Sequence, residues 1–353
     1  MKIGLVRRGF SATGGAEAYL LRLAAGLAEA GHETGLVTSG HWPDSAWPYG
    51  GILRLPGGTP SAFASAFRAA KDRFDVTLSL DRTPGCDVFR AGDGVHAAWL
   101  RRRAAYEPWL RCLFRRWNPK HGALVLLERM VFEEARAIIA NSRMVADEIK
   151  SYYDLPAGRV KVVYNGIGAA IPAVPRADAR AALGIPDRIF CALFVGTGWE
   201  RKGLATAVAA IDRLDDGLLL VAGDGPASAY RGRCGRVRFL GPTRELGAPF
   251  SAADVFVLPT NYDPFSNACL EALSAGLPVV TTTANGCAEI LEPGVHGSVV
   301  PPRDPAATAA ALAEWARRPP ATEACRRLAA EFSITRNVRE TVAILEQAKG
   351  PDT

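Results

Sequence analysis

Short apolar runs alternate with amphipathic stretches from the start of the chain. The run IGLV near the N-terminus has the pattern of a buried strand, and AEAYLLRLAAGLAEAG, residues 16–31, carries apolar residues at helical spacing. A turn with Gly14 and Gly15 lies between them, and TGLVT follows as a second strand. Strand, glycine turn, helix and strand in this order are typical of a parallel sheet with right-handed crossovers.

The same alternation continues to about residue 168. FDVTLSL and ARAIIANS predict further strands, and an Asn-Ser cap precedes the helical stretch MVADEIKSYY. The Ala- and Pro-rich residues 169–187 carry little strand character and predict an interdomain linker. We therefore expect a first α/β domain over residues 1–168.

A second alternating series predicts another domain over residues 169–334. Its six strand-like runs are IFCALFVG, LLLVAGDG, VRFLG, ADVFVLP, LPVVTT and GSVVP. The remaining residues, 335–353, have the pattern of an amphipathic helix that can pack back on the first domain. The fold class is α/β with two doubly wound Rossmann-like domains facing across a cleft, and ligands of such sheets bind outside the carboxyl ends of the strands.

The composition bears on the cellular compartment of the protein and on the kind of ligand that it binds. A chain of 353 residues can bury two cores, and its formal net charge of +6 comes mostly from arginine, which suits phosphate or carboxylate ligands as well as it suits a solvated basic surface. The seven cysteines are scattered without metal-ligand spacing, which predicts reduced thiols. No run resembles a signal peptide or a membrane span, so we expect a cytoplasmic protein.

The stretch NYDPFSNACLEA, residues 261–272, places Asp263 and Glu271 around the start of a predicted helix. Ser266 or Asn267 can cap that helix, whose first amides and dipole favour a phosphate. Carboxylates only accept hydrogen bonds, so two of them beside a phosphate suit the vicinal hydroxyls of a sugar nucleotide. In the alternative interpretation, Asp263 only forms a turn and Glu271 is a solvated residue on the helix surface.

Two further stretches follow predicted strands. In VGTGWERKG, residues 195–203, Arg201 and Lys202 can neutralise a leaving diphosphate without a metal, and the chain contains no Asp-x-Asp sequence for a metal ion. In TPGCDVFRAGDGVHAAW, Asp93 and His96 can orient or deprotonate an acceptor hydroxyl, although Asp93 equally fits a turn and His96 a packed imidazole.

The segment WLRRRAAYEPWLRCLFRRWNPKHG, residues 99–122, is rich in arginine and tryptophan. At helical spacing its aromatic and apolar side chains share one arc and its arginines lie opposite. This composition favours an anionic membrane interface, while a helix packed on its own domain is the alternative. The interface residues would be Trp109, Leu110, Arg111, Leu113, Phe114, Arg115, Arg116 and Trp117.

Taken together, GGAE, Asn-Ser at 141–142, Asn-Gly at 165–166, VGTGWERKG, VAGDGP, Leu-Gly at 240–241 and YDPFSNACLEALSAGLPVVTT resemble the family 4 glycosyltransferases of the GT-B fold. The resemblance spans nearly the whole chain. Within that family, TPGCDVFRAGD is similar to the corresponding stretch of lipopolysaccharide core glucosyltransferases.

The resemblance implies retaining, metal-independent transfer of a glucose-like hexose from a nucleotide sugar, commonly UDP-linked, to a lipid-linked glycan. No cofactor and no nucleic-acid partner are implied, and the place of action would be the inner face of the cytoplasmic membrane. The implied catalytic residues are Asp93, Arg201, Lys202 and Asp263. The implied donor-binding residues are Gly14, Gly15, Arg201, Lys202, Asp263, Phe265, Ser266, Asn267, Ala268 and Glu271.

One position departs from the family pattern, because the family usually has Glu where this chain has Asp263. Two other functions are possible. A Rossmann dehydrogenase would need a G-x-G-x-x-G turn after the first strand, which RRGFSATGGAE does not provide. A non-catalytic protein of the same fold that binds sugar nucleotides or glycolipids would carry the same residues.

Overall fold

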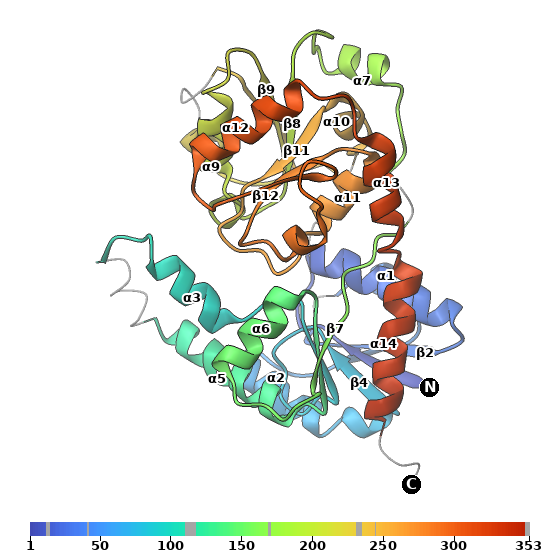
Figure 1. The fold of residues 1–353 in the computed structure, drawn as a ribbon. Helices are drawn as coiled ribbons and strands as arrows, with labels where there is room; N and C mark the ends of the chain where they lie inside the picture. Colours follow the sequence, from blue (N-terminus) through green and yellow to red (C-terminus); the bar gives the residue numbers. More distant parts are fainter. Residues whose placement is uncertain are drawn as a thin grey trace. The chain divides into compact units, whose positions relative to one another are not determined.

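The computed structural model describes residues 1–11, 15–40, 42–109, 118–168, 171–230, 235–243 and 245–349. It divides the chain into two compact units, the first formed by Met1–Gly166 with Ile334–Thr353 and the second by Ile167–Ser333 (Figure 1). Within the described part of the chain, none of the helices combines the length and the apolar character needed to cross a bilayer.

The first unit contains a seven-stranded parallel sheet in the order β3-β2-β1-β4-β5-β6-β7. Its strands are β1 Lys2–Val6, β2 Glu33–Thr38, β3 Ile52–Arg54, β4 Val76–Ser79, β5 Val88–Ala91, β6 Ala137–Ala140 and β7 Val160–Val162. The sequence pattern predicts β1, β2, β4 and β6. It misses β3, β5 and β7, since a basic residue, Arg54, Arg90 or Lys161, interrupts or ends each of these short apolar runs.

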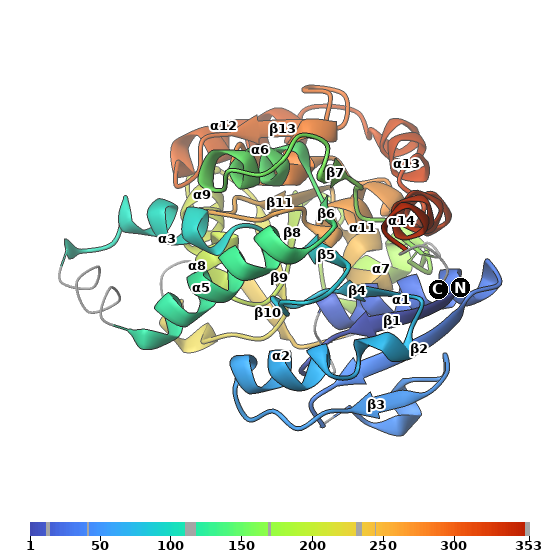
Figure 2. The ribbon, with the colours of Figure 1, turned by 90° about the horizontal axis from the view of Figure 1, so that it is seen from below.

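Helices cover both faces of this sheet (Figure 2). They are α1 Gly15–Glu29, α2 Pro60–Arg68, α3 His96–Ala104, α5 Pro119–Glu134, α6 Arg143–Tyr152 and α14 Ile334–Ala348, with short 3-10 turns η1 Asp44–Ala46 and η2 Lys71–Arg73. Val88 packs in the core with α1 and α14, whereas Phe89 packs in the core with α2, α5 and α6. Successive side chains of β5 therefore point to opposite faces, as in any strand.

The second unit contains a six-stranded parallel sheet in the order β10-β9-β8-β11-β12-β13. The strands are β8 Cys191–Val195, β9 Leu218–Ala222, β10 Val237–Gly241, β11 Val255–Leu258, β12 Val279–Thr282 and β13 Gly297–Val300. They coincide with the six predicted runs. The fold prediction of two doubly wound α/β domains is confirmed.

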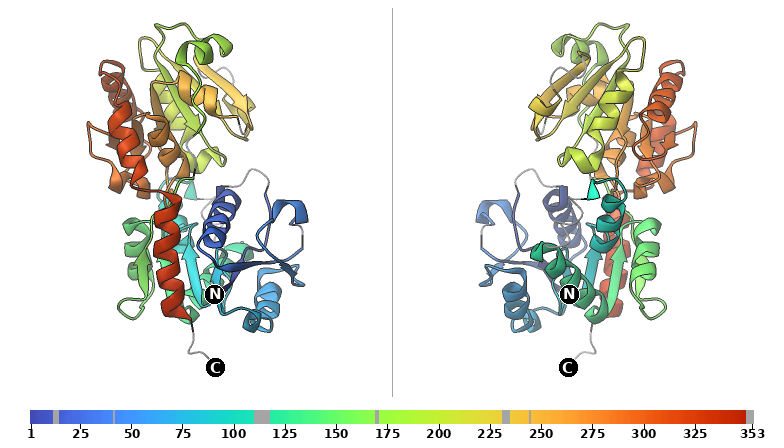
Figure 3. Two further views of the ribbon diagram at one scale, coloured as in Figure 1. Left: turned by 90° about the vertical axis from the view of Figure 1, so that its right-hand side faces the viewer. Right: turned by 90° about the vertical axis from the view of Figure 1, so that its left-hand side faces the viewer.

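The helices of the second unit are α7 Arg176–Ala182, α8 Trp199–Lys202, α9 Leu204–Ile211, α10 Gly247–Ala252, α11 Asn267–Ala275, α12 Pro305–Ala316 and α13 Thr322–Ala330, with 3-10 turns η3 Ala227–Ala229 and η4 Gly286–Ile290. Helix α12 packs against α9, and α11 against α13 (Figure 3). Helix α7 falls in the stretch predicted as a linker. It belongs to the second unit because buried Arg180 pairs with Asp254 at 2.8 Å, a long-range contact that a local pattern cannot reveal.

The strand order reverses once in each unit, between β1 and β4 in the first and between β8 and β11 in the second. At such a point the connections leave to opposite sides and open a crevice at the carboxyl ends of the two strands. The topology therefore places the expected ligand position of each unit in the crevice beside these strand ends.

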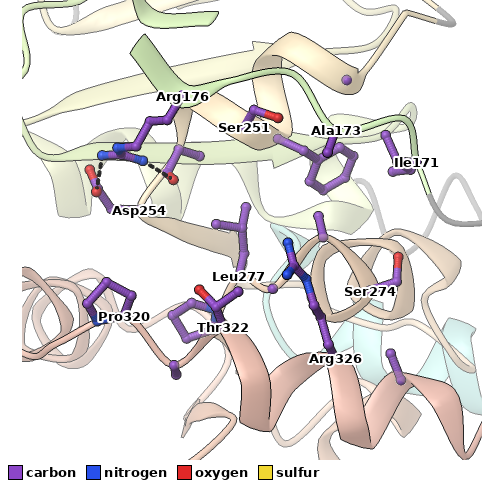
Figure 4. Close-up of a pocket in the computed structure, with 18 of the residues that line it drawn as sticks. Ile171, Ala173, Arg176, Ser251, Asp254, Ser274, Leu277, Pro320, Thr322 and Arg326 are labelled. Carbon is purple, nitrogen blue, oxygen red and sulfur yellow. Dashed lines mark hydrogen bonds and ion pairs between the residues drawn. The ribbon is translucent and has the colours of Figure 1, made fainter.

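A hollow of about 950 Å³ lies at the amino ends of the strands of the second sheet (Figure 4). Its lining includes Phe190, Asp254 and Pro278, which come directly before β8, β11 and β12. Arg176 closes part of it through an ion pair with Asp254. The hollow is thus separate from the crevice at the carboxyl ends.

Gly203 joins α8 to α9 with φ of 76° and leaves no room for a side chain, since a Cβ there would lie 1.9 Å from the carbonyl oxygen of Pro259. We expect Gly203→Ala to lower the free energy of unfolding of the second unit by more than the ~1–2 kcal/mol that left-handed backbone alone costs. Gly184→Ala is the control, because Gly184 has φ of 58° with open space around it. Equal losses in urea unfolding would contradict the close approach.

Candidate functional site

The crevice between β8 and β11 brings together Arg201, Lys202 and Asp263. Arg201 and Lys202 end the short helix α8, which follows β8, and Asp263 follows β11. The Nζ of Lys202 donates a hydrogen bond to the Asp263 carboxylate, and Nη1 of Arg201 lies 3.8 Å from the same oxygen. The structure therefore unites two stretches that the sequence analysis treats separately.

Backbone hydrogen bonds hold the two loops in register. The carbonyl oxygen of Arg201 accepts from the amide of Asn261 at 2.8 Å and from the hydroxyl of Thr260 at 2.8 Å. In return, Nη1 of Arg201 donates to the carbonyl oxygen of Tyr262 at 3.0 Å. These contacts satisfy carbonyls at the end of α8, which a helix leaves without intrahelical partners.

Asp263 is ionised in this setting. Its burial, with 4% of the residue exposed, would by itself raise the pKa of the carboxyl group. The positive charges of Lys202 and Arg201 and a backbone hydrogen bond from Phe265 outweigh that effect, so the pKa of Asp263 is lowered. Asp263 balances one of the two cations, and the side chain of Arg201 remains 38% exposed.

The loop after Asp263 leads into α11, which begins at Asn267. The predicted side-chain cap is wrong for Ser266: its backbone occupies the cap position, but its side chain makes no capping bond. Its buried hydroxyl has no hydrogen-bond partner among the described residues. A buried hydroxyl beside the positive end of a helix is suited to hydrogen bonding with a ligand oxygen.

Asn285 is a residue of this site that the sequence analysis misses. Its Oδ1 accepts from the amides of Ser266 at 3.4 Å and Cys287 at 3.1 Å, and its Nδ2 donates to Thr281 Oγ1 at 2.9 Å. Asn285 thereby fixes the loop before α11 to the end of β12. The Asn-Gly turn in TTTANG is the signal that marks it, since such turns follow strands.

The other predicted donor-binding residues of the second unit lie on or just before α11. Phe265 is buried, and Asn267, Ala268 and Glu271 are half-buried. Glu271 lies one turn into the helix. The second unit thus gathers the predicted positions from Arg201 to Glu271 at the carboxyl ends of β8 and β11.

The crevice of the first unit, between β1 and β4, holds another ion-pair network. Arg7 donates to Asp81 at 2.7 Å and to Glu17 at 3.0 Å. Gly15 begins α1, in whose first turn Glu17 is buried. Gly14 lies outside the described residues.

Asp93 and His96 follow β5 of the first unit. Asp93 is exposed in a turn closed by a 3.1 Å hydrogen bond from Gly94 to Ala91. Buried Glu128 of α5 accepts from the amide of His96 at 2.7 Å and so caps α3. The carboxylate of Glu128 therefore occupies the end of α3 where an anion could otherwise bind.

The imidazole of His96 is a weak base. Its Nε2 lies 3.0 Å from Nδ1 of His121, with the two rings stacked. Burial, followed by the charge of Arg82, lowers the pKa of His96 to about 4, although Glu128 and Asp93 act in the other direction. This environment favours a packing role for His96 over removal of a hydroxyl proton at neutral pH.

The basic segment is described only at its ends. Helix α3 ends at Ala104, and the side chain of Trp109 is 73% exposed, which makes it one of the few exposed large apolar residues of the described chain. The predicted interface residues Leu110, Arg111, Leu113, Phe114, Arg115, Arg116 and Trp117 lie outside the described residues. No grouping of three or more His, Cys, Asp or Glu side chains able to hold a metal ion occurs in the described ranges.

Sequence comparisons match both units of this chain to known glycosyltransferases. A model of glycosyltransferase family 4 matches residues 13–170, and one of glycosyl transferases group 1 matches residues 190–318. A probable transglycosylase of Burkholderia thailandensis is 28% identical over 90% of this chain and 87% of its own length. Several other curated glycosyltransferases are matched over only 52% to 59% of their own length.

Solved structures share the fold. WaaG, a glycosyltransferase involved in lipopolysaccharide biosynthesis, superimposes with a TM-score of 0.81 at 20% identity over 97% of this chain and 99% of its own. Anabaena HepE, solved in complex with UDP and glucose, gives 0.77 at 17% identity over 98% and 100%. The two units define the GT-B class of glycosyltransferases. Within that class, this chain belongs to glycosyltransferase family 4, as the sequence resemblance predicts.

The ion pair of Asp263 gives a pH-dependent contribution to stability. We expect Asp263→Asn to lower the free energy of unfolding at pH 7 by about 3 kcal/mol or more, because it leaves Lys202, 13% exposed, without its partner. Since the pKa of Asp263 is lowered in the folded state, this contribution is present above about 3.9, the usual value for the unfolded chain, and disappears as the pH falls through the lower folded value.

Urea unfolding of both proteins between pH 7 and pH 3 measures this difference. A difference between wild type and Asp263→Asn that stayed constant down to pH 3, or that grew on acidification, would contradict the ion-pair assignment.

Proposed function

We propose that this glycosyltransferase moves a glucose-like hexose, with retention of configuration, from a UDP-linked donor to a lipid-linked glycan such as the lipopolysaccharide core. The observation that carries the proposal is the joining of Arg201, Lys202 and Asp263 beside the start of α11, in the crevice between β8 and β11. Cations, a helix start and carboxylates at one crevice suit a sugar diphosphate.

The two cations would bind the diphosphate. The guanidinium group of Arg201 is partly exposed and can donate two hydrogen bonds to phosphate oxygens. The buried hydroxyl of Ser266 can donate to a further phosphate oxygen. Asp263 holds the Lys202 ammonium in place, so that its charge is oriented before the donor arrives. That one similar fold, HepE, was solved with UDP and glucose supports this kind of donor.

Glu271 would accept hydrogen bonds from the ribose hydroxyls. Asp263 has a second role in this proposal, because a carboxylate whose oxygen is shared with Lys202 can still accept a hydroxyl of the donor sugar. Aspartate is one methylene shorter than the glutamate usual in the family, and its pairing with Lys202 draws it toward α8.

The reaction would be a front-face displacement. The bond from the anomeric carbon to the phosphate oxygen breaks while the acceptor oxygen bonds to the same face of that carbon, and the acceptor proton passes to the leaving phosphate. Lys202 and Arg201 stabilise the charge that develops on the diphosphate. In the proposal neither a metal ion nor a cofactor takes part, and the remaining residues position the reactants.

The competing function is a binding protein of the same fold without turnover. Incubation with UDP-linked hexoses separates the two, since a transferase hydrolyses its donor slowly when the acceptor is missing. Protection against heat by UDP together with no hydrolysis and no transfer would favour the binding protein.

Loss of Lys202 should lower turnover. We expect Lys202→Met to reduce kcat by a factor of about 100 or more, because the leaving diphosphate loses a preorganised cation. The double variant Lys202→Met with Asp263→Asn removes both members of the buried pair and should recover stability without recovering kcat. Recovery of both would mean that Lys202 acts only as the partner of Asp263. Lys150→Ala, which removes an exposed lysine, is the control.

We further propose that the protein acts as a peripheral protein on the inner face of the cytoplasmic membrane. The arginine- and tryptophan-rich residues 99–122 support this, together with the exposed indole of Trp109 and the exposed Arg101 of α3. A lipid-linked acceptor would then lie at the same surface as the enzyme.

Trp109→Ser should weaken binding to vesicles that contain anionic lipid by about tenfold, since the indole loses its contact with the interface. Val295→Ser is a matched control, because Val295 is an exposed apolar residue of the second unit. Cosedimentation with vesicles measures both variants. Equal losses, or none for Trp109→Ser, would remove this residue from the interface.

A further inference from the structure

Arg90 is a buried cation at the carboxyl end of the first sheet that the proposed reaction does not use. It lies in β5, and only 4% of the residue is exposed. Its side chain points to the face covered by α1, where the guanidinium carbon lies 3.8 Å from the centre of the Tyr19 ring. No Asp or Glu pairs with it among the described residues.

The hydrogen bonds of Arg90 are incomplete within the described chain. Nη2 donates to Oδ1 of Asn165, while Nε is buried without a partner. Nη1 lies beside Gly92, where a Cβ would come within 2.5 Å of it. Because a buried charge is costly unless paired, and stacking on Tyr19 offsets only part of that cost, the guanidinium is suited to an anionic partner.

A second unpartnered group lies next to Gly92. Asn141, which follows β6, is 1% exposed and donates through Nδ2 to the carbonyl oxygen of Gly92 at 3.2 Å. This bond fixes the orientation of the amide and leaves the buried Oδ1 without a donor among the described residues. Arg90 thus offers a donor and Asn141 an acceptor, and both side chains lie next to Gly92.

We propose that Arg90 and Asn141 form a subsite for a phosphorylated sugar of the acceptor. Arg90 binds the phosphate through Nη1, and Asn141 accepts a hydroxyl of the same sugar through Oδ1. Gly92, beside Nη1, is half-buried, and the next residue, Asp93, is exposed, so the pair lies close to the protein surface. The inference rests on the proposed transferase function, in which the donor diphosphate belongs to Arg201 and Lys202 of the second unit.

The test uses methyl glucoside 6-phosphate and its unphosphorylated parent as probes, with the full chain saturated with UDP. Wild type should bind the phosphorylated probe at least about tenfold more tightly than the parent, because a charge-assisted hydrogen bond is lost with the phosphate. Calorimetric titration gives both affinities, and the side-chain Nε–H NMR signal of Arg90 should shift with the phosphorylated probe alone.

Three variants locate the effect. Arg90→Gln should abolish the preference for phosphate, and Gly92→Ala should weaken it by filling the space beside Nη1 while keeping the charge. Arg68→Gln, which removes a surface arginine paired with Glu134, should leave it unchanged. Circular dichroism checks folding, and Gly92→Ala keeps the test informative if Arg90→Gln does not fold.

Each other outcome has a distinct meaning. Equal binding of the two probes by wild type, or a preference that persists in both Arg90→Gln and Gly92→Ala, overturns the subsite. A preference seen without UDP but lost when UDP is saturating assigns the phosphate to the donor site and also overturns it. Failure of the proposed function shows separately, as an inability of wild type to bind UDP or hydrolyse UDP-linked hexoses.

Discussion

The ion pair between Lys202 and Asp263 is the interaction on which the second unit's site depends. Both side chains are largely buried, and removing either one would leave the charge of the other buried without a partner. The pair also joins the loop after β8 to the loop after β11. Because these strands flank the reversal of strand order, the same contact holds a cation at the position where ligands of such sheets bind.

The two units follow one architectural rule with different chemistry. In each unit, the loops that follow the parallel strands lie together at the carboxyl ends of the sheet, where side chains far apart in sequence meet. The second unit assembles Arg201, Lys202 and Asp263 there. The first assembles Arg7 with two carboxylates, and carries Arg90 on β5, an interior strand between β4 and β6. In the proposed function, the second unit supplies positive charge for the donor diphosphate, and the first unit offers a surface of mixed charge.

Much of the fold and of the candidate site of the second unit could be predicted from the sequence. The six runs of the second unit are strands, and VGTGWERKG and NYDPFSNACLEA mark the residues that the structure brings together. Other features could not be predicted. The pairing of Lys202 with Asp263 depends on which strands are neighbours, and helix α7 in the expected linker depends on the buried contact of Arg180 with Asp254. Both are long-range contacts, which local periodicity does not encode.

The sequence by itself determined the type of each unit, because the period of apolar residues and the turn residues are local properties of the chain. It also determined the family. The tertiary structure decided which charges are satisfied. Arg90 is one arginine among many in the sequence, yet its place on an inward-facing position of β5 makes it a buried cation. Burial and the choice of partner arise from the packing of the whole sheet, and no short stretch of sequence contains that information.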